Sequence, residues 1–245
     1  MDFNFLGTSD SAGLPVHNCN CIACSNYRKE KKENHSTCAY IEINDEIILI
    51  DAGVYDLTSR FDGKKINAIF LTHFHPDHCV GLLKLRYSND SINCFHPEDE
   101  KGFSDLFKHK HSINYIEINP FEQKIINEIK FTALPLKHSK NTFGYLIEYK
   151  NYKIAYLTDC SGIPKESFHF LQKFQIDYAF IDACYDERKV VGNHLNYLQA
   201  SEILDELNVK NGFLMHISHI TQEYILENDI KLKYPYVKED FNLKF

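Results

Sequence analysis

The sequence predicts a single α/β domain in which two β-sheets are covered by helices. Short apolar segments with strand character alternate along the chain with segments of helical periodicity. A length of 245 residues suits one α/β domain, and no repeat or Pro/Gly/Ser-rich linker divides the chain. Hydrophobic residues make up 44% of the sequence, enough for a sizeable core. We therefore expect one domain over residues 1–245.

The first half of the chain predicts a hairpin, a strand and a helix. Tyr40–Ile43 and Glu46–Ile50 are apolar strands separated by an Asn-Asp turn. Asn67–Thr72 is a third short apolar strand. Asp77–Arg86 has apolar residues on helical faces, so a helix is expected there.

The second half predicts two helices and a larger set of strands. Pro164–Phe174 begins with a proline, which is favourable in the first turn of a helix, and Asn196–Leu207 carries leucines on one stripe. The remaining apolar segments are strands, namely Glu128–Leu134, Phe143–Tyr149, Lys153–Leu157, Asp177–Ile181, Asn211–Met215 and, at the end of the chain, Val237–Phe245.

The charge, apolar runs and cysteine content of the sequence exclude several classes of protein. The net charge is −7, from 27 basic and 34 acidic residues, which argues against a general nucleic-acid binder. No apolar run approaches the ~18 residues of a membrane span, and the first residues lack a secretory signal pattern, so we expect a cytoplasmic protein without a membrane partner. In a reducing compartment, 8 cysteines and 13 histidines favour metal binding over disulfides.

One short segment carries three histidines and one aspartate. His73, His75, Asp77 and His78 lie within six residues, directly after the strand Asn67–Thr72. Imidazole and carboxylate groups are good ligands for divalent transition metals, and they can converge in a strand-to-helix turn. Because one metal ion would not conveniently take so many groups from so short a segment, we expect two metal ions.

Four further polar residues each follow an apolar strand: His138, Asp159, Asp182 and His216. Alone, each would be interpreted as a cap or a surface residue. Together they predict a rim of ligands at one end of the sheets, where a two-metal site would lie.

A second signal is the C-x-C-x-x-C spacing of Cys19, Cys21 and Cys24. Three thiols at this spacing can bind one metal ion, and tetrahedral zinc needs a fourth ligand. We expect a Cys-rich zinc-binding loop near residues 17–38, whose spacing alone leaves the fourth ligand open among His17, His35 and Cys38.

The histidine-rich segment, together with Leu49-Ile50-Asp51-Ala52-Gly53 upstream, resembles the metallo-β-lactamase superfamily over essentially the whole chain. The resemblance implies a four-layer αβ/βα sandwich and a hydrolase with two divalent metal ions. It assigns His73, His75 and His138 to one metal. It assigns Asp77, His78 and His216 to the other metal, and Asp159 to both as a bridge. It also makes Asp51 a carboxylate that orients a ligand histidine.

The cysteine motif and the opening Leu6-Gly7-Thr8 with Gly13-Leu14-Pro15 resemble one branch of that superfamily, the phosphoribosyl 1,2-cyclic phosphate phosphodiesterases. This resemblance makes His219 the fourth zinc ligand and His194 a phosphate-contacting general acid, with Asp77 counted in the catalytic set. The implied reaction is attack of a metal-activated hydroxide on 5-phospho-α-D-ribose 1,2-cyclic phosphate, which gives ribose 1,5-bisphosphate.

The same resemblance implies manganese in the active site, with zinc or another divalent ion as alternatives, and one structural zinc. A small phosphorylated sugar or a cyclic nucleotide is the expected substrate, and a homodimer is compatible with the sequence. Lys137 and Lys140 are candidates for holding the 5-phosphate.

Three alternative functions use related sites. A transfer-RNA 3′-processing endonuclease would need an extended basic arm, which the sequence lacks. A protein of the pyrroloquinoline quinone biosynthesis type also carries a Cys-rich zinc site, but the full histidine and aspartate set favours a hydrolase. The di-iron redox enzymes of the superfamily have glutamate where this chain has His75.

Overall fold

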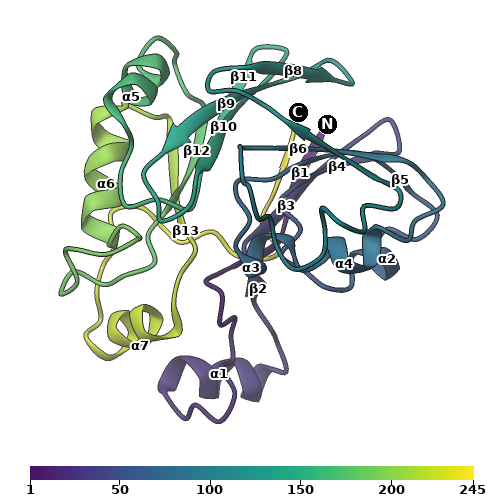
Figure 1. Cartoon of the computed structure of the whole chain (residues 1–245). Helices are drawn as coiled ribbons and strands as arrows, with labels where there is room; N and C mark the ends of the chain where they lie inside the picture. The colour runs from purple at the N-terminus through teal and green to yellow at the C-terminus, as the bar shows by residue number, and fades with distance from the viewer.

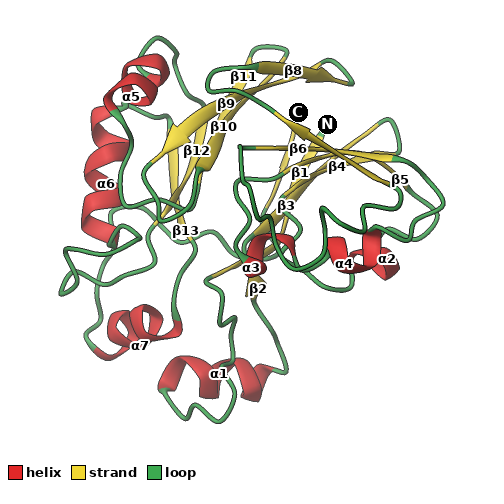
Figure 2. Ribbon diagram, viewed as in Figure 1, coloured by secondary structure: helices red, strands yellow, loops and turns green.

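A computed structural model describes residues 1–245, and in it two β-sheets pack face to face while helices cover their outer sides (Figure 1, Figure 2). One apolar core lies between the two sheets, and one further core lies between each sheet and its helices. The order of layers is therefore helix, sheet, sheet, helix, which confirms the predicted four-layer αβ/βα sandwich. No helix is both long enough and apolar enough to span a bilayer.

The first sheet comes from the N-terminal half of the chain and the last strand. Its strands are β1 (Asp2–Ser9), β2 (His35–Ser36), β3 (Cys38–Ile43), β4 (Glu46–Ile50), β5 (Lys65–Phe70), β6 (Ile92–His96), β7 (Ile113–Glu117) and β14 (Asn242–Lys244). Their order is β14-β1-β3-β4-β5-β6-β7, with β2 paired to β1. Strands β4 to β7 are mutually parallel, so their carboxyl ends lie at one edge.

The second sheet follows in the chain. Its strands are β8 (Gln123–Ile126), β9 (Ile129–Leu136), β10 (Thr142–Tyr149), β11 (Tyr152–Leu157), β12 (Tyr178–Asp182) and β13 (Asn211–Met215), and their order is β13-β12-β11-β10-β9-β8. Strands β11, β12 and β13 are parallel to one another, and the segments that follow them leave the sheet at the same edge.

The helices divide into three groups. α2 (Leu57–Arg60), α3 (Pro76–Cys79) and α4 (Leu82–Leu85) lie outside the first sheet, and α5 (Lys165–Leu171) and α6 (Tyr197–Glu206) lie outside the second (Figure 2). α1 (Ile22–Glu30) and α7 (His219–Glu227) pack against each other below both sheets in the view of Figure 1.

The central core joins the two sheets through aromatic side chains. Phe70 of β5 stacks on Phe131 of β9 with ring centroids 3.9 Å apart, and Phe3 of β1 stacks on Phe180 of β12 at 5.6 Å. All four rings are buried. Burying one such side chain stabilises the fold by about 1.5–3 kcal/mol, so these contacts between sheets are a main source of stability.

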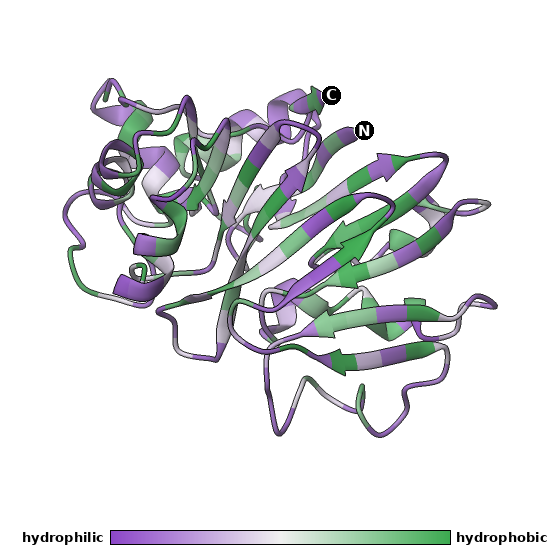
Figure 3. Cartoon of the chain, turned by 90° about the horizontal axis from the view of Figure 1, so that it is seen from above, coloured by the Kyte–Doolittle hydropathy of each residue, from purple (hydrophilic) through white to green (hydrophobic).

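The two ends of the chain meet at one edge of the first sheet. β14 pairs antiparallel with β1, and the Met1 ammonium donates to the Phe245 carbonyl at 3.3 Å. Figure 3 shows both termini side by side at that edge. Of the segment Val237–Phe245, which was predicted as a strand, only Asn242–Lys244 is paired.

The predicted helix Asp77–Arg86 is wrong as a continuous element, because two single-turn helices, α3 and α4, replace it. Backbone hydrogen bonds hold this segment against the loop that follows β4. Ala52 donates its N–H to the His78 carbonyl at 2.8 Å, and its own carbonyl accepts the N–H of Gly81 at 2.8 Å. A Cβ at Gly81 would lie 2.4 Å from the Val54 carbonyl oxygen, so only glycine fits this close approach.

Candidate metal centre and active site

The chemistry-bearing residues gather where strands of both sheets end. His73 and the short helix α3 follow β5, whereas His138 follows β9 and Asp159 follows β11. Asp182 is the last residue of β12, and His216 directly follows β13. Because β11, β12 and β13 are parallel, their carboxyl ends bring the last three of these side chains to one edge.

One cluster contains His73, His75, His138 and Asp159, whose donor atoms all lie within 4.8 Å of one another. His73 Nε2 and His138 Nε2 lie 2.7 and 3.2 Å from His75 Nδ1. Burial lowers the pKa of His75 to about 4 and holds that of His73 well below its ordinary value, so both rings are neutral near pH 7. Neutral imidazole nitrogens that converge in this way are suited to binding a metal ion.

A second cluster contains Asp77, His78, Asp159 and His216, again with donor atoms within 4.8 Å of one another. Asp159 Oδ2 lies 3.1 Å from His78 Nε2 and 3.3 Å from His216 Nε2. Asp159 is thus common to both clusters, which is the position that a bridging carboxylate requires. The structure brings together all seven residues to which the sequence resemblance assigned the metal pair.

Neighbouring polar groups fix the orientation of the ligand rings. Asp51 is fully buried, and its Oδ2 accepts from His78 Nδ1 at 2.7 Å, so His78 turns Nε2 toward the second cluster. Asp51 Oδ1 also accepts the Thr72 N–H at 2.7 Å. In the first cluster, His138 Nδ1 donates to the Asn193 carbonyl at 2.9 Å and so leaves Nε2 facing the other ligands.

A buried histidine without hydrogen-bond partners indicates that the two clusters are suited to divalent metal ions. His216 is only 2% exposed, and neither of its ring nitrogens forms a hydrogen bond in the protein, although Nε2 lies 3.3 Å from Asp159 Oδ2. A buried polar group without a partner is costly, and a metal ion would satisfy Nε2 of this ring. The donor set of imidazole nitrogens and carboxylate oxygens suits manganese, iron, cobalt and zinc alike, so it does not select one metal.

His194 lies beside the clusters and has its own carboxylate partner. Its Nδ1 lies 2.7 Å from Asp182 Oδ2, and its ring stacks on that of His216 at a centroid distance of 4.8 Å. Asp182 is completely buried, and it also accepts the N–H groups of Cys160 and Cys184 at 2.8 and 3.0 Å. His194 therefore donates Nδ1–H to a fixed carboxylate, and Nε2 is left for another partner.

The pairing of Asp182 with His194 was missed by the sequence analysis. Asp182 was recognised there only as a polar residue after a strand. Its separation of 12 residues from His194 has no fixed spacing signal, because the connection between them is an irregular loop.

An open cavity of about 690 Å³ gives access to both clusters. Its lining includes ligands from each cluster together with His194, Tyr185 and Asp10. Burial raises the pKa of Asp10, while nearby His216 opposes that shift. Lys137 and Lys140, the candidates for a 5-phosphate, do not line this cavity, and Lys140 is paired with Asp99 at 2.7 Å.

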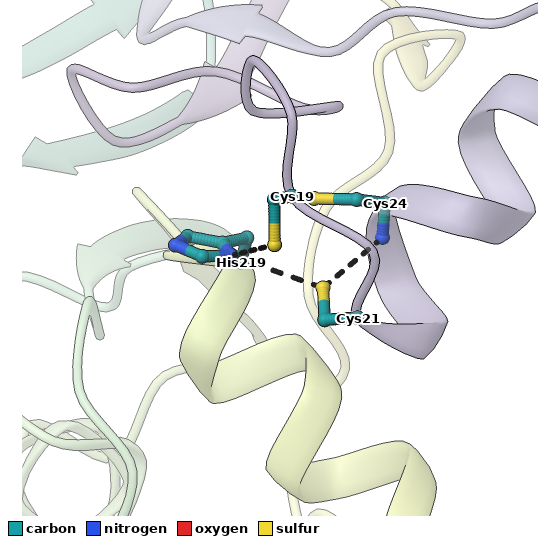
Figure 4. Close-up of side chains that lie close together, drawn as sticks. All are labelled: Cys19, Cys21, Cys24 and His219. Atoms are coloured by element: carbon teal, nitrogen blue, oxygen red, sulfur yellow. Dashed lines mark hydrogen bonds between the residues drawn. The ribbon is translucent and has the colours of Figure 1, made fainter.

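The three cysteines form a separate cluster with His219. Cys19, Cys21 and Cys24 point with His219 toward a common centre, and the four donor atoms lie within 4.8 Å of one another (Figure 4). The Sγ atoms of Cys19 and Cys21 are 3.5 and 3.8 Å from His219 Nδ1. Three thiols and one imidazole match the tetrahedral donor set of a structural zinc.

The local alternatives for the fourth zinc ligand lie elsewhere. His35 Nε2 is 3.3 Å from Arg60 Nη2, and His17 is exposed outside the cluster. Cys38 is buried in the core of the first sheet. The cluster joins the start of α1 to the start of α7, because Cys21 caps α1 and His219 is the first residue of α7.

Comparisons with known proteins agree with this architecture. A diphosphatase of the PhnP family superposes on the chain with a TM-score of 0.83 at 24% identity, over 100% of this chain and 96% of that one. An octanoyltransferase of Porphyromonas gingivalis is 24% identical over 235 residues, 87% of this chain and 45% of that protein. A ribonuclease Z of Methanococcus aeolicus is 33% identical over 171 residues, 61% of this chain and 47% of that protein.

The chain thus spans about half the length of these curated relatives. A family model described as a beta-lactamase superfamily domain matches residues 47–217, which is more than half of the chain and includes both histidine and aspartate clusters. The chain therefore belongs to the β-lactamase superfamily, which confirms the predicted family and fold.

Proposed function

We propose that the chain is a phosphodiesterase that opens a five-membered cyclic phosphate. The predicted substrate is 5-phospho-α-D-ribose 1,2-cyclic phosphate, and nucleoside 2′,3′-cyclic phosphates share the same ring. The observation that carries the proposal is one cavity lined by ligands of both clusters and by His194. The close likeness in fold to a diphosphatase of the PhnP family supports it.

The residues of the two clusters would hold a pair of divalent ions, most simply manganese or zinc. When bound, such a pair lowers the pKa of a water molecule and neutralises charge on phosphoryl oxygens. Asp159 is shared by the two clusters, so it would fix their spacing. Asp51 keeps His78 in the orientation that the second cluster needs.

His194 would supply the proton that the departing oxygen needs. Ring opening releases an alkoxide, which is a poor leaving group unless it is protonated. In protonated His194, Nδ1–H donates to Asp182 and Nε2–H is free to donate into the cavity. Buried Asp182 also stabilises the charged imidazolium before the proton is given up.

A second candidate function is the 3′ processing of transfer RNA. It is favoured by the 33% identity to a ribonuclease Z. Against it, no Lys or Arg side chain lines the cavity, and the net charge of the chain is −7. An enzyme that neutralises many RNA phosphates would need a basic surface.

The test is a parallel assay of protein purified without chelators. Elemental analysis should give two divalent ions for the active site and one zinc for the cysteine cluster. The same sample should cleave bis(p-nitrophenyl) phosphate, 2′,3′-cyclic AMP and the ribosyl cyclic phosphate, and should leave precursor transfer RNA largely intact. Efficient 3′ processing of the RNA, without activity on any cyclic phosphate, would favour transfer-RNA processing over the cyclic phosphodiesterase activity.

A further inference from the structure

A second cavity of about 440 Å³ adjoins the active-site cavity. The two have four lining residues in common, Ser11, Ser36, Gly53 and Val80, so they form one continuous groove. A substrate with its reacting phosphate at the metal clusters has room to extend along this groove. The second cavity is therefore where the distant part of the substrate would lie.

An aromatic ring and an imidazole line the second cavity. The Tyr55 side chain is 53% exposed, and Lys84 Nζ lies 4.3 Å from its ring centroid. Arg60 Nη2 lies 3.3 Å from His35 Nε2, and a guanidinium group only donates hydrogen bonds. His35 Nε2 therefore accepts this hydrogen bond, which leaves Nδ1 as the donor of the ring.

The groove contains no cationic side chain to hold a second phosphate. No lysine or arginine lines either cavity, whereas the carboxylates of Asp10, Glu33 and Asp56 do. Phosphate recognition normally uses arginine or lysine. Arg60, the guanidinium behind His35, is already bound to Asp56 at 2.7 Å.

Two further cations near the groove lie on aromatic rings. Lys189 Nζ is 3.6 Å from the ring centroid of Tyr185, and Lys84 lies over Tyr55 as described above. Neither lysine belongs to the lining of the groove. The electrostatic balance of the groove is therefore unfavourable for a second dianionic group.

We propose that the second cavity binds an uncharged, nucleoside-like group, with Tyr55 as a stacking surface and His35 as a hydrogen-bond donor. This inference rests on the proposed function, and it selects nucleoside 2′,3′-cyclic phosphates over a sugar that carries a second phosphate. An aromatic ring can stack on any nucleobase, so the site would favour the class of nucleosides rather than one base.

The experiment compares kcat/KM of the metal-loaded full chain on 2′,3′-cyclic AMP and on the ribosyl cyclic phosphate. We expect the wild-type protein to prefer the nucleotide by about tenfold or more. Tyr55→Ala should raise KM for the nucleotide by roughly tenfold, with kcat little changed, because stacking is lost. The same variant should leave kcat/KM for the sugar phosphate within about twofold.

Two further variants sharpen the test. Glu33→Lys places a cation in the second cavity and should shift the preference in kcat/KM toward the sugar phosphate. The control is Tyr87→Ala, which removes an exposed tyrosine outside the groove and should leave kcat/KM unchanged for both substrates. A wild-type preference for the sugar phosphate, or a preference unchanged in Tyr55→Ala, would overturn the inference while leaving the proposed function intact. Failure of the wild-type protein to open any cyclic phosphate would refute both the inference and the proposed function.

Discussion

Replacing Asp182 with asparagine should slow the opening of a cyclic phosphate by roughly 10- to 150-fold. The Asp182 carboxylate is fully buried, and its Oδ2 lies 2.7 Å from His194 Nδ1. A hydrogen bond to a charged group contributes about 1.5–3 kcal/mol, and each 1.36 kcal/mol corresponds to a tenfold change in rate. The loss arises because asparagine no longer stabilises the imidazolium that protonates the leaving oxygen.

The assay is a comparison of leaving groups. On 2′,3′-cyclic AMP the leaving group is an alkoxide that needs a proton, and His194→Ala should lower kcat by about 10²- to 10⁴-fold. On bis(p-nitrophenyl) phosphate the leaving group is a stable phenolate. Both Asp182→Asn and His194→Ala should therefore lower kcat much less on that substrate.

Equal losses on the two substrates would refute this reasoning, because they would show that His194 only positions the phosphate. His169→Ala is a suitable control, since His169 is an exposed histidine on α5, outside the cavity. Melting temperature and metal content should be measured for each variant. They must stay near the wild-type values before a rate loss is assigned to proton transfer.

The remaining predictions concern the metals and the substrate class. Asp159→Ala should abolish activity and lower the content of active-site metal while the far-ultraviolet circular dichroism stays native, and wild-type turnover in this variant would contradict a bridging role. Cys21→Ser and His219→Ala should each release one zinc and lower the melting temperature by roughly 5 °C or more, as measured by elemental analysis and calorimetry. If Cys38→Ser released the zinc instead, the fourth ligand would be local. Finally, kcat/KM on a small cyclic phosphate should change by less than about threefold between 50 and 200 mM salt, whereas a steep fall would indicate binding to many phosphates.

Local signals in the sequence predicted the parts of the fold in which neighbouring residues decide the structure. The hairpin of β3 and β4 and the strand Asn211–Met215 follow from runs of apolar residues bounded by turn formers. The start of α6 follows from Asn196, whose side chain accepts the N–H of Gln199 in a capping box. In each case the determining contacts lie within a few residues.

Elements that depend on distant partners were not predicted. β6 and β7 are short strands at the end of the first sheet, and each pairs with strands about 20 residues away. β8 is also short, and it pairs with β9 directly after it in the chain. β1 did carry a usable signal, since Phe3 and Phe5 alternate with polar residues and face the central core. The division of Asp77–Arg86 into two helices depended on hydrogen bonds to Ala52, which periodicity cannot show.

The candidate site was more predictable than the fold because metal ligands are restricted to a few residue types. Three imidazoles and a carboxylate in one turn limit the chemistry strongly, whatever the order of the strands. The second cavity carried no such signal. Tyr55 and His35 are ordinary residues in the sequence, and only the approach of β2 to the loop after β4 makes them neighbours.

The cysteine cluster and the second metal cluster are adjacent in sequence but held by separate contacts. Only Ile217 and Ser218 lie between His216 and His219. Ile217 donates its N–H to the Thr8 carbonyl at 3.2 Å, and Ser218 Oγ donates to the Cys184 carbonyl at 3.0 Å. Because these bonds keep His216 in place without the zinc, loss of zinc should loosen the contact of α1 with α7 far more than it slows the reaction. A kcat reduced in proportion to zinc loss, in protein that remains folded, would instead show that the zinc itself positions His216.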